Sequence, residues 1–161
     1  MSHTYYKNHV HVVFHTGRRT IKPKDLERLH AYIGGLAKQF KVQKPIVGGT
    51  ADHIHMLGEF PLDKAPSQIV GAIKAISSRW IKGLHSEYGR FAWQQGFGYF
   101  SVSSSERHKV VDYIKNQAEH HKNETAAQEY ARLIRLHYGA SGDEAAITCP
   151  PRAVRAANFE P

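Results

Sequence analysis

The chain has 161 residues, of which 41% are hydrophobic and 22% are charged. This length and composition suit one globular domain and exclude a disordered chain. Lysine and arginine number 22 against 14 acidic residues, which gives a net charge of +8 and a pI near 9.6. The excess of positive charge favours a polyanionic partner, most often a nucleic acid, over a basic protein that has no such partner.

The sequence also bears on the compartment. No apolar run approaches the roughly 18 residues that a membrane-spanning helix needs. Residues 1–10 lack the charged and apolar regions of a secretory signal, and the single cysteine, Cys149, cannot form a disulfide within the chain. We therefore expect a cytoplasmic protein with no membrane partner.

Hydrophobic periodicity predicts four elements in the first 60 residues. Val10, Val12 and Phe14 alternate with polar residues, which is typical of a strand, whereas Leu29 and Ile33 belong to a helical stripe. The predicted elements are a strand over 5–15, a helix over 23–40 with Pro23 near its first turn, and strands over 44–49 and 53–60.

The remaining sequence predicts a second long helix over 63–89, a short strand near 99–103, and helices over 105–123 and 125–139. Ser104 or Ser105 is a candidate N-cap for the third helix, and Gly139 ends the fourth. The order predicts an α+β fold, a ferredoxin-like or RRM-like β-α-β-β-α-β arrangement with an antiparallel sheet and additional C-terminal helices. We expect one domain over 1–139 and a poorly ordered tail over 140–161.

The stretch "DHIHML" at 52–57 carries two histidines two residues apart. On a strand, His53 and His55 point to the same face. They are either a ligand pair for a metal or two polar side chains on a solvated face. His9 and His11 repeat the pattern on the first strand, so the spacing alone does not choose between the pairs.

Tyr113 and Gln117 are four residues apart and project from the same side of the third helix. A phenolate beside a metal can attack a phosphodiester and keep the energy of that bond in a phosphotyrosine. Gln117 can offer a neutral carbonyl oxygen as a third ligand. The alternative is ordinary helix packing, without chemistry.

These stretches, in order, resemble the IS200-like (IS200/IS605) single-tyrosine transposases, the Y1 members of the HUH nucleases. The first strand with its basic turn is similar to the family's first strand, and "DHIHML" resembles its His-hydrophobic-His motif. The resemblance continues through "SSRWIK", "WQQGFGYFSVS" and "YIKNQAEHHK", and covers roughly residues 5–138.

The resemblance implies the roles of individual residues. Tyr113 would be the nucleophile, and His53, His55 and Gln117 would hold Mg²⁺ or Mn²⁺. We expect only this histidine pair, and not His9 and His11, to face the site. The substrate would be single-stranded DNA with hairpins, cleaved to a 5′-phosphotyrosine and then rejoined, and the protein would act as a homodimer whose sites can combine residues of both chains.

Several side chains are candidates for binding DNA. Cations could contact phosphates, and aromatic rings could stack on unpaired bases or pack in the core instead. The candidates are Arg18, Arg19, Lys74, Arg79, Lys82 and Trp93, with Phe97 and Tyr99 as further aromatic candidates. Two alternatives to the transposase are open: a domesticated or non-catalytic protein that binds nucleic-acid hairpins, and a phosphoesterase that uses the histidines and a water.

Overall fold

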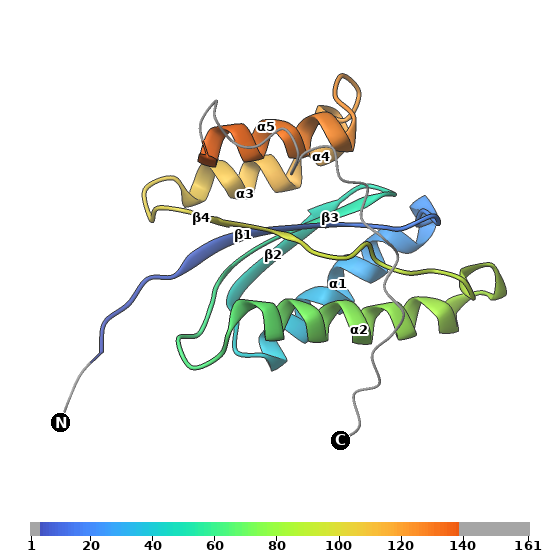
Figure 1. Cartoon of the computed structure of the whole chain (residues 1–161), viewed down its shortest axis with the longest axis horizontal. Helices are drawn as coiled ribbons and strands as arrows, with labels where there is room; N and C mark the ends of the chain where they lie inside the picture. Colours follow the sequence, from blue (N-terminus) through green and yellow to red (C-terminus); the bar gives the residue numbers. More distant parts are fainter. Residues whose placement is uncertain (1–3, 139–161) are drawn as a thin grey trace.

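The computed structural model describes residues 4–138 and contains one four-stranded sheet with helices on both of its faces (Figure 1). In chain order the elements are β1 (His9–His15), α1 (Pro23–Gln39), β2 (Gln43–Gly49), β3 (His53–Glu59), α2 (Pro66–Leu84), the 3-10 helix η1 (Ser86–Tyr88), β4 (Gly98–Ser101), α3 (Arg107–Lys115), α4 (Gln117–His120) and α5 (Ala126–Tyr138).

The strands lie in the order β2-β3-β1-β4, and every neighbouring pair is antiparallel. Helix α1 connects β1 to β2, and α2 connects β3 to β4, so each crossover skips the strand that lies between its two ends. This is the split β-α-β arrangement, and the α+β prediction is confirmed. The predicted boundary at residue 139 and the tail over 140–161 lie outside the described residues.

One face of the sheet packs on α1 and α2 (Figure 1). Alternation along β1 and β3 sends Val10, Val12, Phe14, Ile54 and Met56 to this face, and each is 0–1% exposed. The buried stripes of the two helices cover them and form the main core. Because these strands bury alternate residues here, their remaining residues all point to the opposite face.

Helices α3, α4 and α5 cover that opposite face (Figure 1). A glycine in β2 allows α3 to approach closely. A Cβ at Gly48 would lie 2.7 Å from both Cγ2 and the carbonyl oxygen of Ile114, so α3 could not keep this position over any larger residue. Gly48 pairs with His55 in the sheet, and Ile114 follows Tyr113. The close approach therefore places the tyrosine helix directly over the histidine strand.

Several local predictions differ from the structure, and the helix predicted over 63–89 spans only Pro66–Leu84, with the separate η1 after it. Strand β1 begins at His9 rather than residue 5. At this end of the strand, the outermost hydrogen bonds to the sheet are those that the Asn8 and His9 carbonyls accept from the amides of Phe60 and Val102. The helix predicted over 105–123 is interrupted at Asn116, whose φ of −99° and ψ of 20° leave the helical range. The N-cap of α3 is Glu106, with no side-chain capping bond, so the predicted serine cap is wrong.

Within residues 4–138, no helix combines the length and the apolar character that crossing a bilayer requires.

Candidate active site

The face of the sheet under α3–α5 carries a cluster of histidines. His53 and His55 project from β3, and both are completely buried. In the antiparallel register His15 of β1 lies opposite His53, and His11 lies four residues from His15 on the same face of the sheet. Sheet pairing thus gathers four imidazoles, and the local alternation of "HVHVVFH" and "HIHML" is the reason that all of them share one side.

Each histidine of β3 has one ring nitrogen held from behind. His53 Nδ1 lies 2.7 Å from Asp52 Oδ1, which also accepts a 2.8 Å hydrogen bond from the Thr50 hydroxyl. His55 Nδ1 lies 2.8 Å from His11 Nε2. In both rings Nε2 is left to face the interior between sheet and helices. Such rear contacts fix the tautomer and orientation of metal-binding imidazoles.

The contact between His11 and His55 corrects one expectation. His11 is 3% exposed, and its ring stacks on that of His55 with centroids 5.0 Å apart. We predicted that His53 and His55 face the site and that His9 and His11 do not. That prediction is wrong for His11. The reason is strand pairing, which the spacing of either motif does not reveal. His9, one pleat further out, has no partner for its buried Nδ1 among the described residues.

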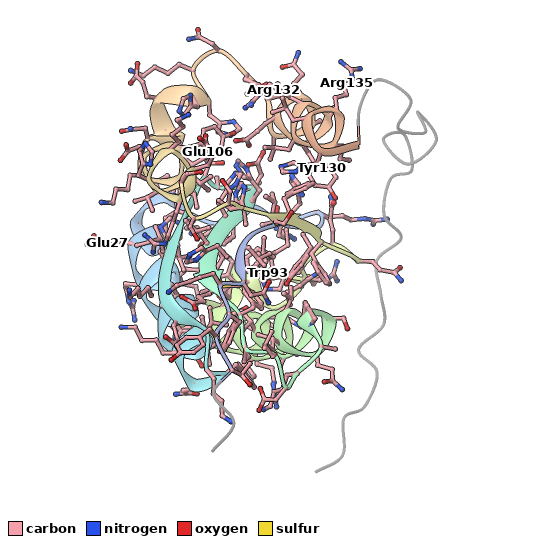
Figure 2. The ribbon with its side chains drawn as sticks, turned by 90° about the vertical axis from the view of Figure 1, so that its left-hand side faces the viewer. Glu27, Trp93, Glu106, Tyr130, Arg132 and Arg135 are labelled. Atoms are coloured by element: carbon pink, nitrogen blue, oxygen red, sulfur yellow. The ribbon has the colours of Figure 1, made fainter. Side chains whose placement is uncertain are left out.

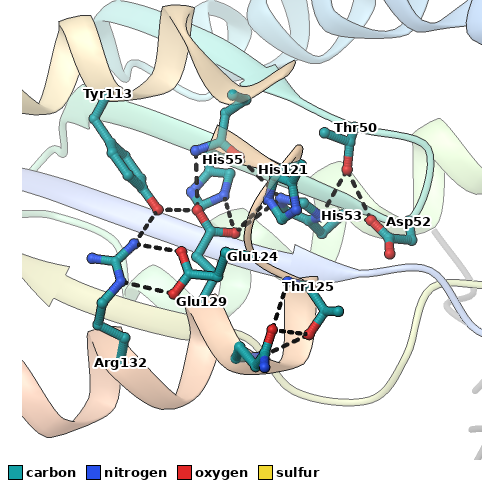
Figure 3. Close-up of polar contacts among 12 residues, drawn as sticks. Thr50, Asp52, His53, His55, Tyr113, His121, Glu124, Thr125, Glu129 and Arg132 are labelled. Atoms are coloured by element: carbon teal, nitrogen blue, oxygen red, sulfur yellow. Dashed lines mark hydrogen bonds and ion pairs between the residues drawn. The ribbon is translucent and has the colours of Figure 1, made fainter. Parts of the chain in front are cut away.

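A glutamate of α5, Glu129, meets both Nε2 atoms. Its Oε2 lies 3.2 Å from His53 Nε2, 3.3 Å from His55 Nε2 and 2.9 Å from His121 Nε2 (Figure 3). The side chain is 1% exposed. One ligand atom from each of His53, His55 and Glu129 lies within 4.8 Å of the others, so these three groups fit a metal ion.

Glu129 is a site residue that the sequence prediction missed. It lies outside the resemblance's own motifs, but a signal was present. On α5, Glu129 precedes Leu133 by four residues and therefore shares its buried face, with Tyr130 and Ile134 beside it. An acidic residue on the apolar stripe of a helix needs a charged or hydrogen-bonding partner, because a buried carboxylate is costly without one.

Gln117 lies at the edge of the same site and is 2% exposed. Its Oε1 is 3.1 Å from His53 Nε2, and its Nε2 donates to Glu129 Oε1 at 3.0 Å. The break at Asn116 leaves Gln117 at the start of α4 with its side chain still directed at the histidines. The structure therefore brings all three predicted ligands together and adds a carboxylate.

The electrostatics of the cluster follow from these contacts. Burial opposes protonation of His53, but hydrogen bonds to Asp52, Glu129 and Gln117 outweigh it and raise the pKa of His53 to about 9. Burial lowers the pKa of His55. Burial and the neighbouring His55 together lower the pKa of His11 to about 3. Burial would raise the pKa of Glu129, but its bonds to the histidines hold the pKa far below the ordinary range. A proton on His53 thus stabilises the carboxylate when no cation is present.

Tyr113 joins this network from α3. Its hydroxyl donates to Glu129 Oε1 and accepts from Arg132 Nη2 at 2.9 Å (Figure 3). The guanidinium carbon of Arg132 lies 5.6 Å from the centroid of the tyrosine ring. Glu124 accepts two 3.0 Å hydrogen bonds from Arg132 and fixes it there. Burial and the Glu129 carboxylate raise the pKa of Tyr113, whereas Arg132 opposes that increase.

The two oxygens of Glu129 therefore have different neighbours. Oε2 contacts the histidines, and Oε1 contacts Tyr113 and Gln117. One carboxylate links the candidate metal-binding nitrogens to the candidate nucleophile. All of these contacts are made by residues within one chain.

The predicted DNA contacts divide into two groups. Trp93 is 7% exposed, lies between the sheet and α2, and donates to Ser77 Oγ at 3.0 Å (Figure 2). Trp93 therefore packs in the core, which was the alternative to base stacking for the aromatic candidates. Phe97 and Tyr99 pack against the same core. Lys74 donates to the Gln94 and Gly96 carbonyls, both at 2.6 Å, and so ties down the loop that precedes β4.

The other cations are exposed. Arg18 and Arg19 lie in the β1–α1 connection, whereas Arg79 and Lys82 lie on α2, which covers the face of the sheet opposite the site (Figure 1). Burial lowers the pKa of Lys74 to about 8, which further separates it from these solvated charges. A role in binding DNA stays a prediction for all of them.

Comparisons with known proteins give the following matches. The family model described as IS200-like transposase matches residues 4–117. A solved structure from Deinococcus radiodurans R1, classed as a transposase, has a TM-score of 0.57 at 19% identity and covers 73% of this chain and 95% of its own. A REP-associated tyrosine transposase bound to a REP hairpin has a TM-score of 0.50 at 16% identity and covers 98% of this chain and 99% of its own. No curated protein matches the sequence.

Proposed function

Because this chain belongs to the IS200-like transposase family, we propose that it is an HUH-type enzyme that cleaves and rejoins single-stranded DNA near hairpins through a phosphotyrosine on Tyr113. The observation that carries the proposal is the contact network in which Glu129 joins the Tyr113 hydroxyl to His53 and His55. A nucleophile and a set of metal-binding groups lie within one hydrogen bond of each other.

The donor set fits a divalent metal. His53, His55 and Glu129 would hold it, and Gln117 Oε1 lies close enough to add a neutral oxygen. Imidazoles alone favour zinc, copper or nickel, but carboxylate and amide oxygens shift the preference toward the Mg²⁺ or Mn²⁺ that we propose. A bound metal would neutralise charge on a phosphate that reaches the site.

The protein's own residues account for the rest of the reaction. The Tyr113 oxygen forms a bond to phosphorus, the phenol loses its proton, and the bond from phosphorus to the 3′ oxygen breaks. That oxygen takes up a proton and leaves as a free 3′-OH, while the 5′ phosphate stays on the tyrosine. Arg132 Nη2, 2.9 Å from the attacking oxygen, favours the phenolate and can contact the phosphate. Rejoining reverses the same steps.

Single-stranded DNA with hairpins is the substrate that we propose. The net charge of +8 supports a polyanionic ligand, and a structural neighbour of the same fold carries a REP hairpin. Such an enzyme would act on DNA in the cytoplasm.

Substitution of the nucleophile tests the chemistry. The protein is incubated with hairpin-bearing single-stranded DNA and Mn²⁺, and covalent adducts are separated on a denaturing gel. Tyr113→Phe removes the attacking oxygen, so no adduct should form, while DNA binding is retained. Tyr5→Phe, at an exposed tyrosine outside the site, is the matched control and should form adducts like the wild type. DNA binding without an adduct in the wild type would favour the non-catalytic hairpin-binding alternative.

A homodimer is also proposed, on the family resemblance, but the cis geometry predicts that each chain builds its own site. Inactive His53→Ala and inactive Tyr113→Phe proteins are mixed under conditions in which subunits exchange. Every site then carries one lesion, and the mixture should stay inactive. Recovery of adduct formation would show that sites are shared between chains.

A further inference from the structure

A cavity of about 540 Å³ opens beside the active site. It lies where three connections meet: the β1–α1 connection, the turn between β2 and β3, and the segment from α4 into α5. Its lining residues are Thr20, Thr50, Ala51, Asp52, His121, Lys122, Asn123, Glu124, Thr125, Ala126 and Gln128. Its volume is within the range of sites that enclose a ligand the size of a nucleotide.

Two wall residues belong at the same time to the active site. Asp52 Oδ1 lies 2.7 Å from His53 Nδ1, and His121 Nε2 lies 2.9 Å from Glu129 Oε2 (Figure 3). A group in the cavity is thus one residue away from the metal-binding histidine. A strand whose phosphate lies between His53 and Tyr113 must continue on both sides, and this cavity adjoins the site through His121, which lines the cavity and contacts Glu129.

The lining does not suit a phosphate. Asp52 presents a carboxylate, both oxygens of Glu124 are bound to Arg132, and Lys122 pairs with Glu119 at 2.7 Å. Asp52 Oδ1 accepts from the Thr50 hydroxyl and lies against His53 Nδ1, which fixes the carboxylate in the wall of the cavity. The Asp52 carboxylate repels a phosphate but can accept a hydrogen bond from an amino group, as acidic side chains do when they read cytosine.

The amides supply the complementary donors. Gln128 Oε1 accepts from both the backbone and the hydroxyl of Thr125, at 2.9 and 3.0 Å, which caps α5. Its NH₂ group is therefore the part that remains to donate to a ligand. Asn123 is exposed, lines the cavity and can both donate and accept. Donors beside acceptors match a base that carries an amino group next to a ring nitrogen.

We propose that this cavity binds one unpaired base of the DNA strand, next to the scissile phosphate, and selects adenine or cytosine over thymine. The proposal rests on the proposed function and adds to it a determinant of where the strand is cut. Arg18 and Arg19 directly precede Thr20 of the lining and bring positive charge to the strand's backbone near the cavity. The base enters the cavity, and the phosphates stay outside it.

Labelled homo-octamers test the selection, because each places the same base in the cavity in every register. Affinities for dA₈, dC₈ and dT₈ are measured by fluorescence anisotropy in EDTA, so that no strand is cut. The wild type should bind dA₈ or dC₈ about tenfold or more tightly than dT₈, which corresponds to one good base contact.

Two variants remove the contacts separately. Gln128→Glu keeps the oxygen that caps α5 but replaces the NH₂ donor, and Asn123→Ala removes the second amide. Each should reduce the preference by several-fold or abolish it. Gln68→Ala, at an exposed glutamine of α2, should leave the preference unchanged. An equal affinity of the wild type for all three octamers, or an unchanged preference in both variants, overturns the proposal.

The adduct assay on Tyr113 is scored on the same proteins. Adduct formation by the wild type together with an unchanged base preference in the variants would overturn the base site and leave the proposed function standing. A lost preference in the variants, with no adduct from the wild type, would do the opposite.

Discussion

The two faces of the sheet are built from the same strands yet have opposite chemistry. Residues of one parity in β1 and β3 are aliphatic or aromatic and are buried against α1 and α2. Residues of the other parity include His11, His15, His53 and His55, and they lie under α3–α5. Alternation along a strand allows one element to stabilise the fold and carry the site at once. Predictions that separate the two faces follow, from the largest expected effect to the smallest.

Substitutions at adjacent residues of β3 should affect different properties, namely stability at one position and metal binding at the other. Ile54→Ala removes a fully buried side chain from the core and should lower the free energy of unfolding by about 2–5 kcal/mol. His53→Ala should abolish Mn²⁺ binding and adduct formation at a smaller cost in stability. Thermal unfolding in EDTA and Mn²⁺ titration by calorimetry measure the two effects. If His53→Ala keeps its Mn²⁺ affinity, the metal is held elsewhere.

Helix α5 should take part in the chemistry as well as in the packing. Arg132→Ala removes the donor to the Tyr113 oxygen and should slow adduct formation by roughly 10²–10³-fold, as loss of a transition-state donor does in other enzymes. Arg135→Ala is the matched control, because Arg135 is exposed one turn further along the same helix (Figure 2). Single-turnover rates measure both variants. Equal rates for Arg132→Ala and the wild type would assign Arg132 to structure alone.

The histidines of β1 should differ from each other. His11→Ala removes the group behind His55 and should weaken Mn²⁺ binding by about 10–100-fold, which is typical for the loss of a residue that orients a metal ligand. His9→Ala should leave the affinity nearly unchanged, because His9 does not contact either ligand histidine in the described structure. His11→Gln, which can still pair with His55, should recover part of the loss. Identical losses at both positions would contradict this difference.

The smallest effect concerns a polar group on the apolar side. Asp25 of α1 is 3% exposed and accepts hydrogen bonds from Tyr88 at 2.8 Å and from His85 at 3.3 Å. Burial would raise the pKa of Asp25, but these bonds outweigh it and lower the pKa. Its contribution to stability is therefore present above the unfolded pKa, near 4, and is lost as the pH falls through the folded pKa.

Asp25→Asn removes this titration. Between pH 6 and pH 3, the melting temperature of the variant should fall less than that of the wild type, and near pH 7 the variant should be less stable by about 1–3 kcal/mol. Melting curves across this range, with DNA and metal absent, measure the difference. Parallel acid limbs would assign the acid sensitivity to other carboxylates.

The sequence by itself determined the elements and much of the candidate site. Local periodicity predicted the strands and helices and their α+β order, and the alternation in "DHIHML" placed both histidines on one face. Tyr113 and Gln117 lie four residues apart on one helical side, which is also local geometry. Each of these features depends on a few neighbouring residues, so it can be predicted from the sequence without the tertiary structure.

Only the tertiary structure decided which distant groups meet. Glu129 is 74 residues from His55 and belongs to a helix whose docking face is set by contacts across the sheet. The strand register places His11 in contact with His55. Trp93 is buried in the core, and composition could not distinguish it from a residue that stacks on bases. Spacing within a motif carries no information about such partners. Burial decided them, because a buried carboxylate or imidazole is stable only where other chain segments supply its hydrogen bonds.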